Sequence, residues 1–340
     1  MFTEMETKDN TQSGIVRLVK VITGYREFGM LIAFAVLLII AAIITPSMYS
    51  LNSLLAMLRN YSIYGIMAAG MMGVIITGGI DLSVGSTLAF SGAVAALMII
   101  AGFPVAVCIL AAVLIGCLCG AVNGMLIGKF KMLPMMATLS TMYIYRGVAY
   151  LVSGGAWMMP HQFPEAYTKV AGGQILGIFN ILWILALVFV AAHIFYSKTR
   201  PGRRIYAVGS SPESAAIVGL KNDWILLIAY TIMGALAGLT GFLYTANYAV
   251  WEPAVGGGME MDVIAICILG GVSIRGGVGK IGGLTVAMLM MSVMSYFLSM
   301  IPGMSVWKMA IQGGIIIIAV AVNIFTGTLS EKRILRAREL

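Results

Sequence analysis

The sequence predicts an all-α membrane protein with about ten transmembrane helices, and two observations lead to this fold class. First, 60% of the 340 residues are hydrophobic and only 10% are charged, whereas a soluble domain is about half apolar and about a quarter charged. Second, the hydrophobic residues fall into long runs that short polar segments separate. Because one span needs roughly 20 apolar residues, the chain has room for about ten spans.

The expected spans follow one another closely, and residues that break helices end several of them. Pro46 ends the first span, Gly102 and Pro104 form a turn after the third, and the eighth is short and stops at Gly270. Arg59 lies near the start of the second span, so its first turns are expected at the membrane interface or beside a cavity. The expected spans cover 28–45, 54–77, 84–101, 105–127, 133–152, 180–196, 224–245, 261–269, 284–300 and 306–325.

The basic residues predict the orientation of these spans. If the N-terminus is cytoplasmic, all but four of the 21 Lys and Arg residues lie on the inner side, as the positive-inside rule requires. Both termini are therefore expected in the cytoplasm, and the protein is expected to cross its membrane several times. The first 27 residues lack the apolar core of a cleavable signal peptide, so the first span is expected to be retained. The predicted organisation is a cytoplasmic tail at 1–27, one transmembrane domain at 28–326 with a cytoplasmic loop at about 198–223, and a basic tail at 327–340.

Two glycine-rich breaks interrupt the apolar sequence. The first, Thr77–Ser86, contains Asp81 between two apolar segments, and an ionisable residue there either caps the next helix or has a function in transport. The charge count puts this break at the inner mouth, where capping by Asp81 is favoured and residues 78–85 are a candidate gate or hinge. The second break covers residues 270–283, and a short or glycine-interrupted span is a pointer to a transport pathway. An internal duplication is an open alternative for this pair of breaks.

Polar and glycine residues near the breaks are the candidate gate and pathway residues. Each also has a structural alternative, because such residues can cap helices or form hydrogen bonds between helices. Arg146, in the fifth span, is expected to extend toward the interface or to pair with another group. The candidates are Asn60, Tyr61, Gly79, Asp81, Ser83, Gly85, Thr138, Gly270 and Gly271.

Several other chemistries find no support in the sequence. The four cysteines lie in apolar runs and are expected to be small buried side chains, not disulfides, and the two histidines have no metal-ligand spacing. Residues 277–282 match the pattern GxGxxG but lack the strand–helix context of a dinucleotide site. They also fail as a phosphate-binding loop, because Ile281 follows Lys280 and Ile274 stands where a glycine is required. We therefore expect no cofactor on this chain, and if ATP drives it, another chain must bind the nucleotide.

A short helix is predicted in the basic loop. Ser211 can cap it, Pro212 suits its first position, Glu213 complements the positive helix start, and Gly219 can end it. A helix of about two turns needs packing partners. The partner is either the surface of the protein itself or a groove on another protein.

These motifs resemble the permease subunits of ribose-type sugar ABC importers, a family that also includes importers of other sugars, a furanosyl signal molecule and nucleosides. The resemblance covers about 28–325, and its most specific piece is Gly79-Ile-Asp-Leu-Ser-Val-Gly85. The spacing Glu213-x-Ala215-x-x-x-Gly219 resembles the loop by which such permeases dock their ATPases, with Ser214 in place of Ala. Further matching pieces are Asn123-Gly124, Ala137-Thr-Leu139, Arg146-Gly147, Pro201-Gly-Arg203, Ala207-Val-Gly209, Met261-Asp262 and Leu269-Gly-Gly271.

The resemblance implies a type II-like importer permease that forms half of a pore and crosses the bacterial inner membrane several times. It implies a second permease chain, two ATP-binding subunits that hold ATP and Mg, and an extracytoplasmic binding protein that delivers a sugar or sugar-like solute. Two alternatives are a secondary transporter driven by an ion gradient, for which Asp81 and Arg146 are few charged residues within spans, and a membrane scaffold, which would not need glycine-rich breaks. The solute and the identity of the second permease chain stay open. The implied ATPase-coupling residues are Arg203, Ser211, Pro212, Glu213, Ala215, Ala216 and Gly219.

Overall fold

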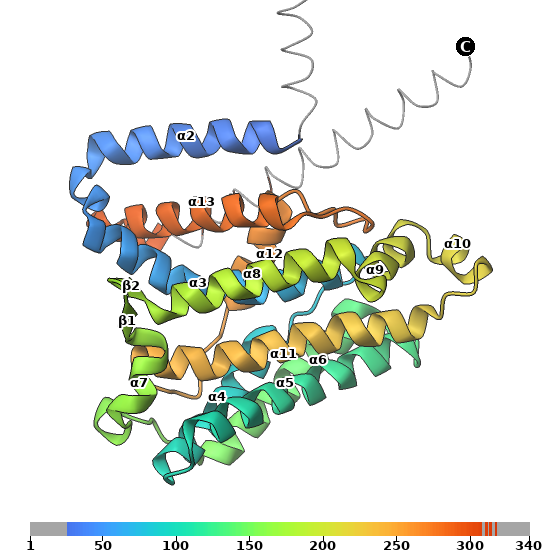
Figure 1. Cartoon of the computed structure of the whole chain (residues 1–340), viewed down its shortest axis with the longest axis horizontal. Coiled ribbons are helices and arrows are strands. Elements are labelled where there is room, and N and C mark those ends of the chain that lie inside the picture. The colour runs from blue at the N-terminus through green and yellow to red at the C-terminus, as the bar shows by residue number, and fades with distance from the viewer. Residues whose placement is uncertain (1–25, 308–309, 312, 315–316, 318–340) are drawn as a thin grey trace, which may run out of the picture.

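Long helices that run nearly parallel to one another form the protein (Figure 1). The computed structural model describes residues 26–307, 310–311, 313–314 and 317. In chain order the elements are α2 (Arg26–Ile44), η1 (Pro46–Tyr49), α3 (Leu51–Ile76), α4 (Val84–Ile100), α5 (Val105–Gly128), α6 (Pro134–Ser153), η2 (Pro160–Gln162), α7 (Glu165–Gly172), β1 (Gln174–Ile175), β2 (Ile178–Phe179), α8 (Asn180–Lys198), α9 (Arg200–Ser210), α10 (Pro212–Ile217), α11 (Asn222–Tyr248), α12 (Met259–Leu269), α13 (Ile281–Met300) and η3 (Met304–Trp307).

The first nine expected spans each fall on a described helix, namely α2 to α6, α8 and α11 to α13. Four of these helices, α5, α8, α11 and α13, are long and apolar enough to cross a membrane. The tenth expected span, 306–325, lies largely outside the described residues, as do most of the N-terminal tail and the whole C-terminal tail. The helical fold class is therefore confirmed for the described chain, whereas the number of membrane crossings stays a prediction.

The two ends of the bundle differ, and we name each end by the short helix that it carries. The α7 end carries α7 and the β1–β2 hairpin, and the α10 end carries α9 and α10 (Figure 1). Helix α3 runs toward the α10 end, where the carbonyl of its last residue, Ile76, accepts a hydrogen bond of 2.9 Å from the amide of Gly277. Helix α5 also ends there, with Gly128 against Asp223 at the start of α11. Helix α11 therefore runs back toward the α7 end, antiparallel to α5.

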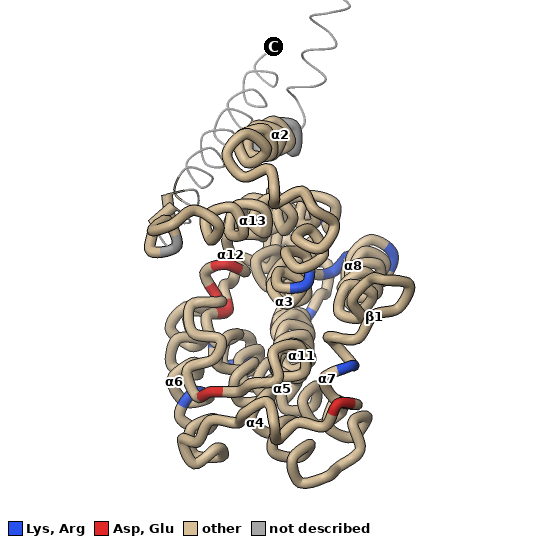
Figure 2. The backbone as a smooth tube through the Cα atoms, turned by 90° about the vertical axis from the view of Figure 1, so that its left-hand side faces the viewer, with Lys and Arg blue, Asp and Glu red and all other residues tan. Residues whose placement is uncertain are grey.

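Helix α11 occupies the middle of the layers. It packs against α3 on one side and against α4 and α5 on the other. Helix α3 in turn contacts α8, α12 and α13, α2 covers α13, and α6 lies outside α4. The view along the helices shows these layers, and most of the backbone tube carries no charged residue (Figure 2). Scarce charge along the bundle is what a bilayer demands, because an unpaired ion in hydrocarbon is costly.

Small residues set the close approach of α5 to α11. A Cβ atom on Gly116 would collide with the carbonyl oxygen of Gly234 and lie 2.8 Å from the amide nitrogen of Gly238. Gly120 meets α11 in the same way, at Tyr230 and Gly234. The predicted glycine face of the fourth span is thus a helix–helix contact, in which small residues allow two backbones to approach.

Both central helices are followed by a break inside the bundle. After α3 the chain turns at residues 77–83, and α4 runs back toward the α7 end; after α11 the chain turns at residues 249–258, and α12 runs back toward the α10 end. With 11 residues, α12 is only about 17 Å long, shorter than the roughly 30 Å hydrocarbon core. The two breaks meet where Gly85 and Gly256 touch, since a Cβ on either residue would collide with the carbonyl oxygen of the other. The structure therefore contains two helix–break–helix units of opposite direction in contact with each other.

Candidate functional site

The first break holds a buried polar cluster centred on Asp81. One carboxylate oxygen of Asp81 accepts hydrogen bonds from the backbone amide of Ser83 at 2.9 Å and from its hydroxyl at 2.7 Å. The side-chain amide of Asn123, on α5, donates to the Ser83 hydroxyl at 2.8 Å and lies 3.4 Å from the same Asp81 oxygen. All three side chains are buried, and Asp81 is only 2% exposed. Neither ion pair of the described chain involves Asp81, so neutral donors alone satisfy its carboxylate.

This geometry makes Asp81 the acceptor of the turn that precedes α4, whose N-cap residue is Ser83, so Asp81 is not the N-cap that the sequence favoured. Its bond to the Ser83 amide is the local side chain-to-backbone bond by which aspartate stabilises turns. The side-chain amide of Asn123 links this turn to α5. The hydroxyl of Tyr145, on α6, lies 3.5 Å from the side-chain oxygen of Asn123. The cluster therefore joins the break to two neighbouring helices by side-chain hydrogen bonds.

Two further predicted residues lie at the same break. Thr138, on α6, places its hydroxyl 3.3 Å from the carbonyl oxygen of Ile80 and 2.9 Å from that of Pro134. Gly79 faces the hydroxyl of Tyr230, and a Cβ atom at position 79 would collide with it. A side chain at position 79 would therefore push the break away from α11.

The break after α11, residues 249–258, is a different segment from the glycine-rich break at 270–283, and two large side chains hold it in place. The Trp251 ring is fully buried, and its indole nitrogen donates to the carbonyl oxygen of Ala89, on α4, at 3.0 Å. The Arg146 guanidinium, on α6, donates to the carbonyl oxygens of Val255 and Pro253, to the latter at 3.0 Å. Arg146 thus pairs with backbone carbonyls, which answers the question that the sequence left open. These bonds satisfy backbone groups that a bilayer could not satisfy.

The glycine-rich loop after α12 lies at the α10 end. Gly271 has a φ of 80°, a conformation that favours glycine, and Gly270 packs against the backbone of Leu284 on α13. Gly277 reaches the end of α3 through the bond to Ile76 already described. The predicted pair Gly270 and Gly271 therefore contributes to a connection between α12, α13 and α3, next to the first break in space.

Helix α9 connects this loop to α10. The Tyr206 hydroxyl donates to the carbonyl oxygen of Gly279 at 2.7 Å. Gly209 lies directly against the Ile76 carbonyl, where a Cβ atom would collide. Helix α9 itself was not predicted, although Thr199 caps it by accepting from the Gly202 amide at 3.1 Å. The cap and the proline at its second position were the signals that could have revealed it.

The predicted short helix forms as α10, with the predicted caps. The Ser211 hydroxyl accepts from the Ser214 amide at 3.2 Å, Pro212 begins the helix, and Gly219 follows it with a φ of 81°. Ala215 is buried against the protein, whereas Glu213 and Ala216 are exposed. Beyond them, Ile217 and Val218 are 86% and 75% exposed. The helix thus packs one side on its own chain and presents an apolar pair outward.

The structure separates the predicted residues into groups. Asp81, Ser83, Thr138 and Gly79 meet at the first break, and Gly85 contacts Gly256 in the break after α11. Asn60 and Tyr61 lie in the first half of α3, about 24 Å along the helix from Ile76. There the Asn60 side chain accepts from the Tyr248 hydroxyl at 3.2 Å, and the Tyr61 ring stacks on Tyr64 with centroids 4.9 Å apart.

Arg59 satisfies the expectation for the start of the second span. It donates to the side chain and backbone carbonyl of Asn247 at 2.6 and 2.7 Å and lies over the Phe179 ring. It also lines a cavity of about 370 Å³ at the α7 end. Since its charge has partners, α3 continues as one helix through this polar stretch.

Asn123, Tyr145, Trp251 and Tyr206 were not selected from the sequence as site residues. An amide within an apolar span is a signal for Asn123, because such groups form hydrogen bonds between helices. The other three are aromatic residues among many, and only their contacts distinguish them.

Long apolar helices, breaks satisfied inside the bundle and a capped helix presented at one end define a helical membrane protein of the transport-subunit class. The chain belongs to the family of branched-chain amino acid transport system permease components, whose family model matches residues 53–320. It is a permease subunit of an ATP-driven importer, a transport component and not an enzyme. Such permeases work with ATPase and binding-protein partners.

Curated relatives resemble the chain over most of its length. It is 35% identical over 295 residues to the ribose import permease protein RbsC of Escherichia coli (strain K12), covering 86% of this chain and 92% of the relative. It is 32% identical to the L-arabinose ABC transporter permease protein AraH of Azospirillum brasilense, covering 86% of each chain. It is 33% identical to the galactose/methyl galactoside import permease protein MglC of Salmonella typhimurium (strain LT2), covering 89% and 95%. No solved structure matches the chain.

Proposed function

We propose that the chain is one half of the pore of an importer for a sugar or sugar-like solute in the bacterial inner membrane. Three relatives that each cover most of the chain are sugar permeases by name, which supports this solute class. In this proposal the chain crosses the membrane about ten times and pairs with a second permease chain, and both termini are cytoplasmic.

The α10 end faces the cytoplasm in this proposal. The described cations at this end outnumber those at the α7 end, in agreement with the positive-inside rule. They are Lys129, Lys131, Lys198, Arg200, Arg203, Arg204, Lys221, Arg275 and Lys280. The opposite end, with α7 and the hairpin, would receive the binding protein.

The observation that carries the proposal is α10. A short helix with a buried Ala215, followed by the exposed apolar pair Ile217 and Val218 at its end, is suited to a contact with another protein, because exposed apolar side chains beside a helix can enter a groove on a partner. We assign this groove to an ATPase subunit, with Glu213 and Ala216 on the exposed side and Arg203 beside the helix. ATP and Mg would be held by that partner, and no cofactor by this chain.

A chain of contacts supports transmission from α10 to the first break. Helix α10 packs on α9, α9 binds the loop after α12 through Tyr206, and this loop binds the end of α3 through Gly277. The break with Asp81 follows directly after α3. Movement of α10 by the ATPase would therefore displace residues 78–85, the proposed inner gate, with Thr138, Gly270 and Gly271 beside it. Asn60 and Tyr61 would belong to the outer part of the pathway.

Reconstitution of the chain with and without its ATPase tests this proposal. Uptake of a labelled sugar into proteoliposomes is expected only when the ATPase and ATP are on the side of the membrane that the α10 end faces. The binding protein must be present on the other side. Uptake by the chain alone, driven by an ion gradient without ATP, would contradict it and support a secondary transporter.

A further inference from the structure

Two grooves flank the first turn of α11 at the α10 end, and neither belongs to the break or to the exposed pair of α10. The first, between α9 and α11, has a volume of about 310 Å³ and is lined by Pro201, Arg204, Ile205, Gly219, Leu220, Lys221, Trp224, Ile225 and Ile228. The second, between α5 and α11, has about 490 Å³ and is lined by Gly124, Met125, Lys129, Lys221, Asn222, Asp223, Trp224 and Leu227. The two grooves share Lys221 and Trp224.

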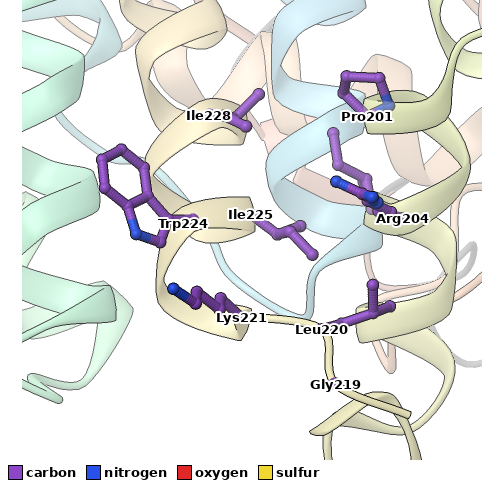
Figure 3. Close-up of a pocket in the computed structure, with 9 residues that line it drawn as sticks. Pro201, Arg204, Gly219, Leu220, Lys221, Trp224, Ile225 and Ile228 are labelled. Atoms are coloured by element: carbon purple, nitrogen blue, oxygen red, sulfur yellow. The ribbon is translucent and has the colours of Figure 1, made fainter.

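The side chains of the first groove combine charge and apolar surface. Arg204 from α9 and Ile225 from α11 point toward one another across it, and Trp224 projects from the other side of α11 (Figure 3). Ile225 and Ile228 follow one another along α11 and form an apolar wall that leads away from the cations toward the middle of the bundle. Arg204 and Lys221 are both exposed, so their charges are available to a ligand.

The charges of both grooves are unbalanced. Arg204, Lys221 and Lys129 contribute three cations, whereas the acid among the lining residues, Asp223, is ion-paired with Lys131. A ligand that fits must therefore be anionic at one end. The apolar walls on either side of Trp224 require that the rest of it be hydrocarbon.

We propose that this double groove binds an anionic diacyl phospholipid. Its phosphate lies between Arg204 and Lys221, and its two acyl chains run along the apolar walls on the two sides of α11. Trp224 is 61% exposed, and tryptophan favours the membrane–water interface. Basic pockets between helices at the membrane surface are suited to anionic headgroups. The proposal requires that the α10 end lies at a membrane surface, and it does not require that α10 binds an ATPase.

The test measures quenching of Trp224 fluorescence by brominated lipid. The full chain is reconstituted in phosphatidylcholine vesicles with a small fraction of either brominated phosphatidylglycerol or brominated phosphatidylcholine. The difference between the native chain and Trp224→Phe isolates the signal of Trp224. We expect about a 30-fold preference for the anionic lipid, from two cations at about 1 kcal/mol each.

Two double variants test which cations cause the preference for the anionic lipid. Arg204→Gln with Lys221→Gln should abolish it, whereas Lys198→Gln with Arg200→Gln, which removes two exposed cations outside the grooves, should retain it. Equal quenching by both lipids in the native chain, or equal loss in both double variants, would overturn the proposal.

Two further experiments distinguish a bound anionic lipid from a free phosphate compound and from the ATPase. Soluble glycerol phosphate should leave the quenching unchanged, and its displacement of the brominated lipid would show a site for free phosphate instead. Added ATPase subunits should likewise leave quenching unchanged. Displacement of the lipid by the ATPase, with loss of ATPase binding in Arg204→Gln with Lys221→Gln, would assign the grooves to the ATPase and refute lipid binding.

Discussion

Replacing Asp81 by asparagine tests whether the first break acts in transport or only stabilises the turn that leads into α4. Asparagine keeps one acceptor oxygen, which can still accept from the amide and hydroxyl of Ser83 at the observed positions. Its amide nitrogen would then face the amide nitrogen of Asn123, which lies 3.5 Å from the second carboxylate oxygen of Asp81. The variant therefore loses one hydrogen bond and gains a donor–donor contact.

The expected cost follows from these contacts. One lost hydrogen bond is worth about 1 kcal/mol, and an unpaired buried donor costs about 1–3 kcal/mol. A total of about 2–4 kcal/mol is below a typical stability of about 5–15 kcal/mol, so Asp81→Asn should still fold and reach the membrane. If the same break must re-form in each transport cycle, the lower end of this penalty corresponds to about a 30-fold lower uptake.

The assay compares uptake into proteoliposomes with the amount of monodisperse protein extracted from membranes. Ser91→Ala is the matched control, because the buried Ser91 hydroxyl bonds only to carbonyls of its own helix, at Thr87 and Leu88. Uptake should fall in Asp81→Asn while extraction of both variants stays near the native level. Loss of Asp81→Asn from the membrane, or native uptake by it, would refute a role of the break in transport.

Three other substitutions test α10 as the proposed ATPase contact, the link of α9 to the loop after α12, and the contact between Gly85 and Gly256. Glu213→Lys should abolish co-purification of the ATPase without loss of the permease from the membrane, because Glu213 is exposed on α10; unchanged co-purification would count against docking there. Tyr206→Phe removes one hydrogen bond to the loop after α12, worth about 1 kcal/mol, and should lower uptake about fivefold while ATPase binding persists; loss of ATPase binding would argue for a direct contact instead. Gly85→Ala would place a Cβ against the backbone of Gly256 and should lower the yield of folded protein through overpacking of about 1–3 kcal/mol. Gly147→Ala, on α6 in open space, is its control and should keep a native yield.

Helix caps and helix faces could be predicted from the sequence where residues close together in the chain determine them. The caps of α10 are an example, because Ser211, Pro212 and Gly219 act on backbone groups within a few residues. The glycine face of α5 is another, since four-residue spacing puts these residues on one side of a helix. Helix α9 was missed because its basic residues resemble an exposed loop, while its buried Ile205 and Val208 have meaning only against the bundle.

The candidate site could be predicted only in part. Asp81, Ser83 and Gly79 were found because they interrupt apolar sequence, and they do lie together at the break. Their partners Asn123 and Tyr230 are far away in the chain and could not be chosen by spacing. Asn60 and Tyr61 share the same expected span with the break, but a straight helix carries them toward its opposite end.

Composition and local pattern were enough to establish a helical membrane protein, most of its helices and a capped helix at the basic loop. These properties depend on the hydrophobic effect and on backbone groups that nearby residues satisfy. Only the tertiary structure decided that the break with Asp81 is tied to α5, that Arg146 holds the break after α11, and that Gly85 and Gly256 touch. Such contacts join residues that are far apart in the sequence. They depend on which helix faces pack together, and no local period in the sequence specifies this.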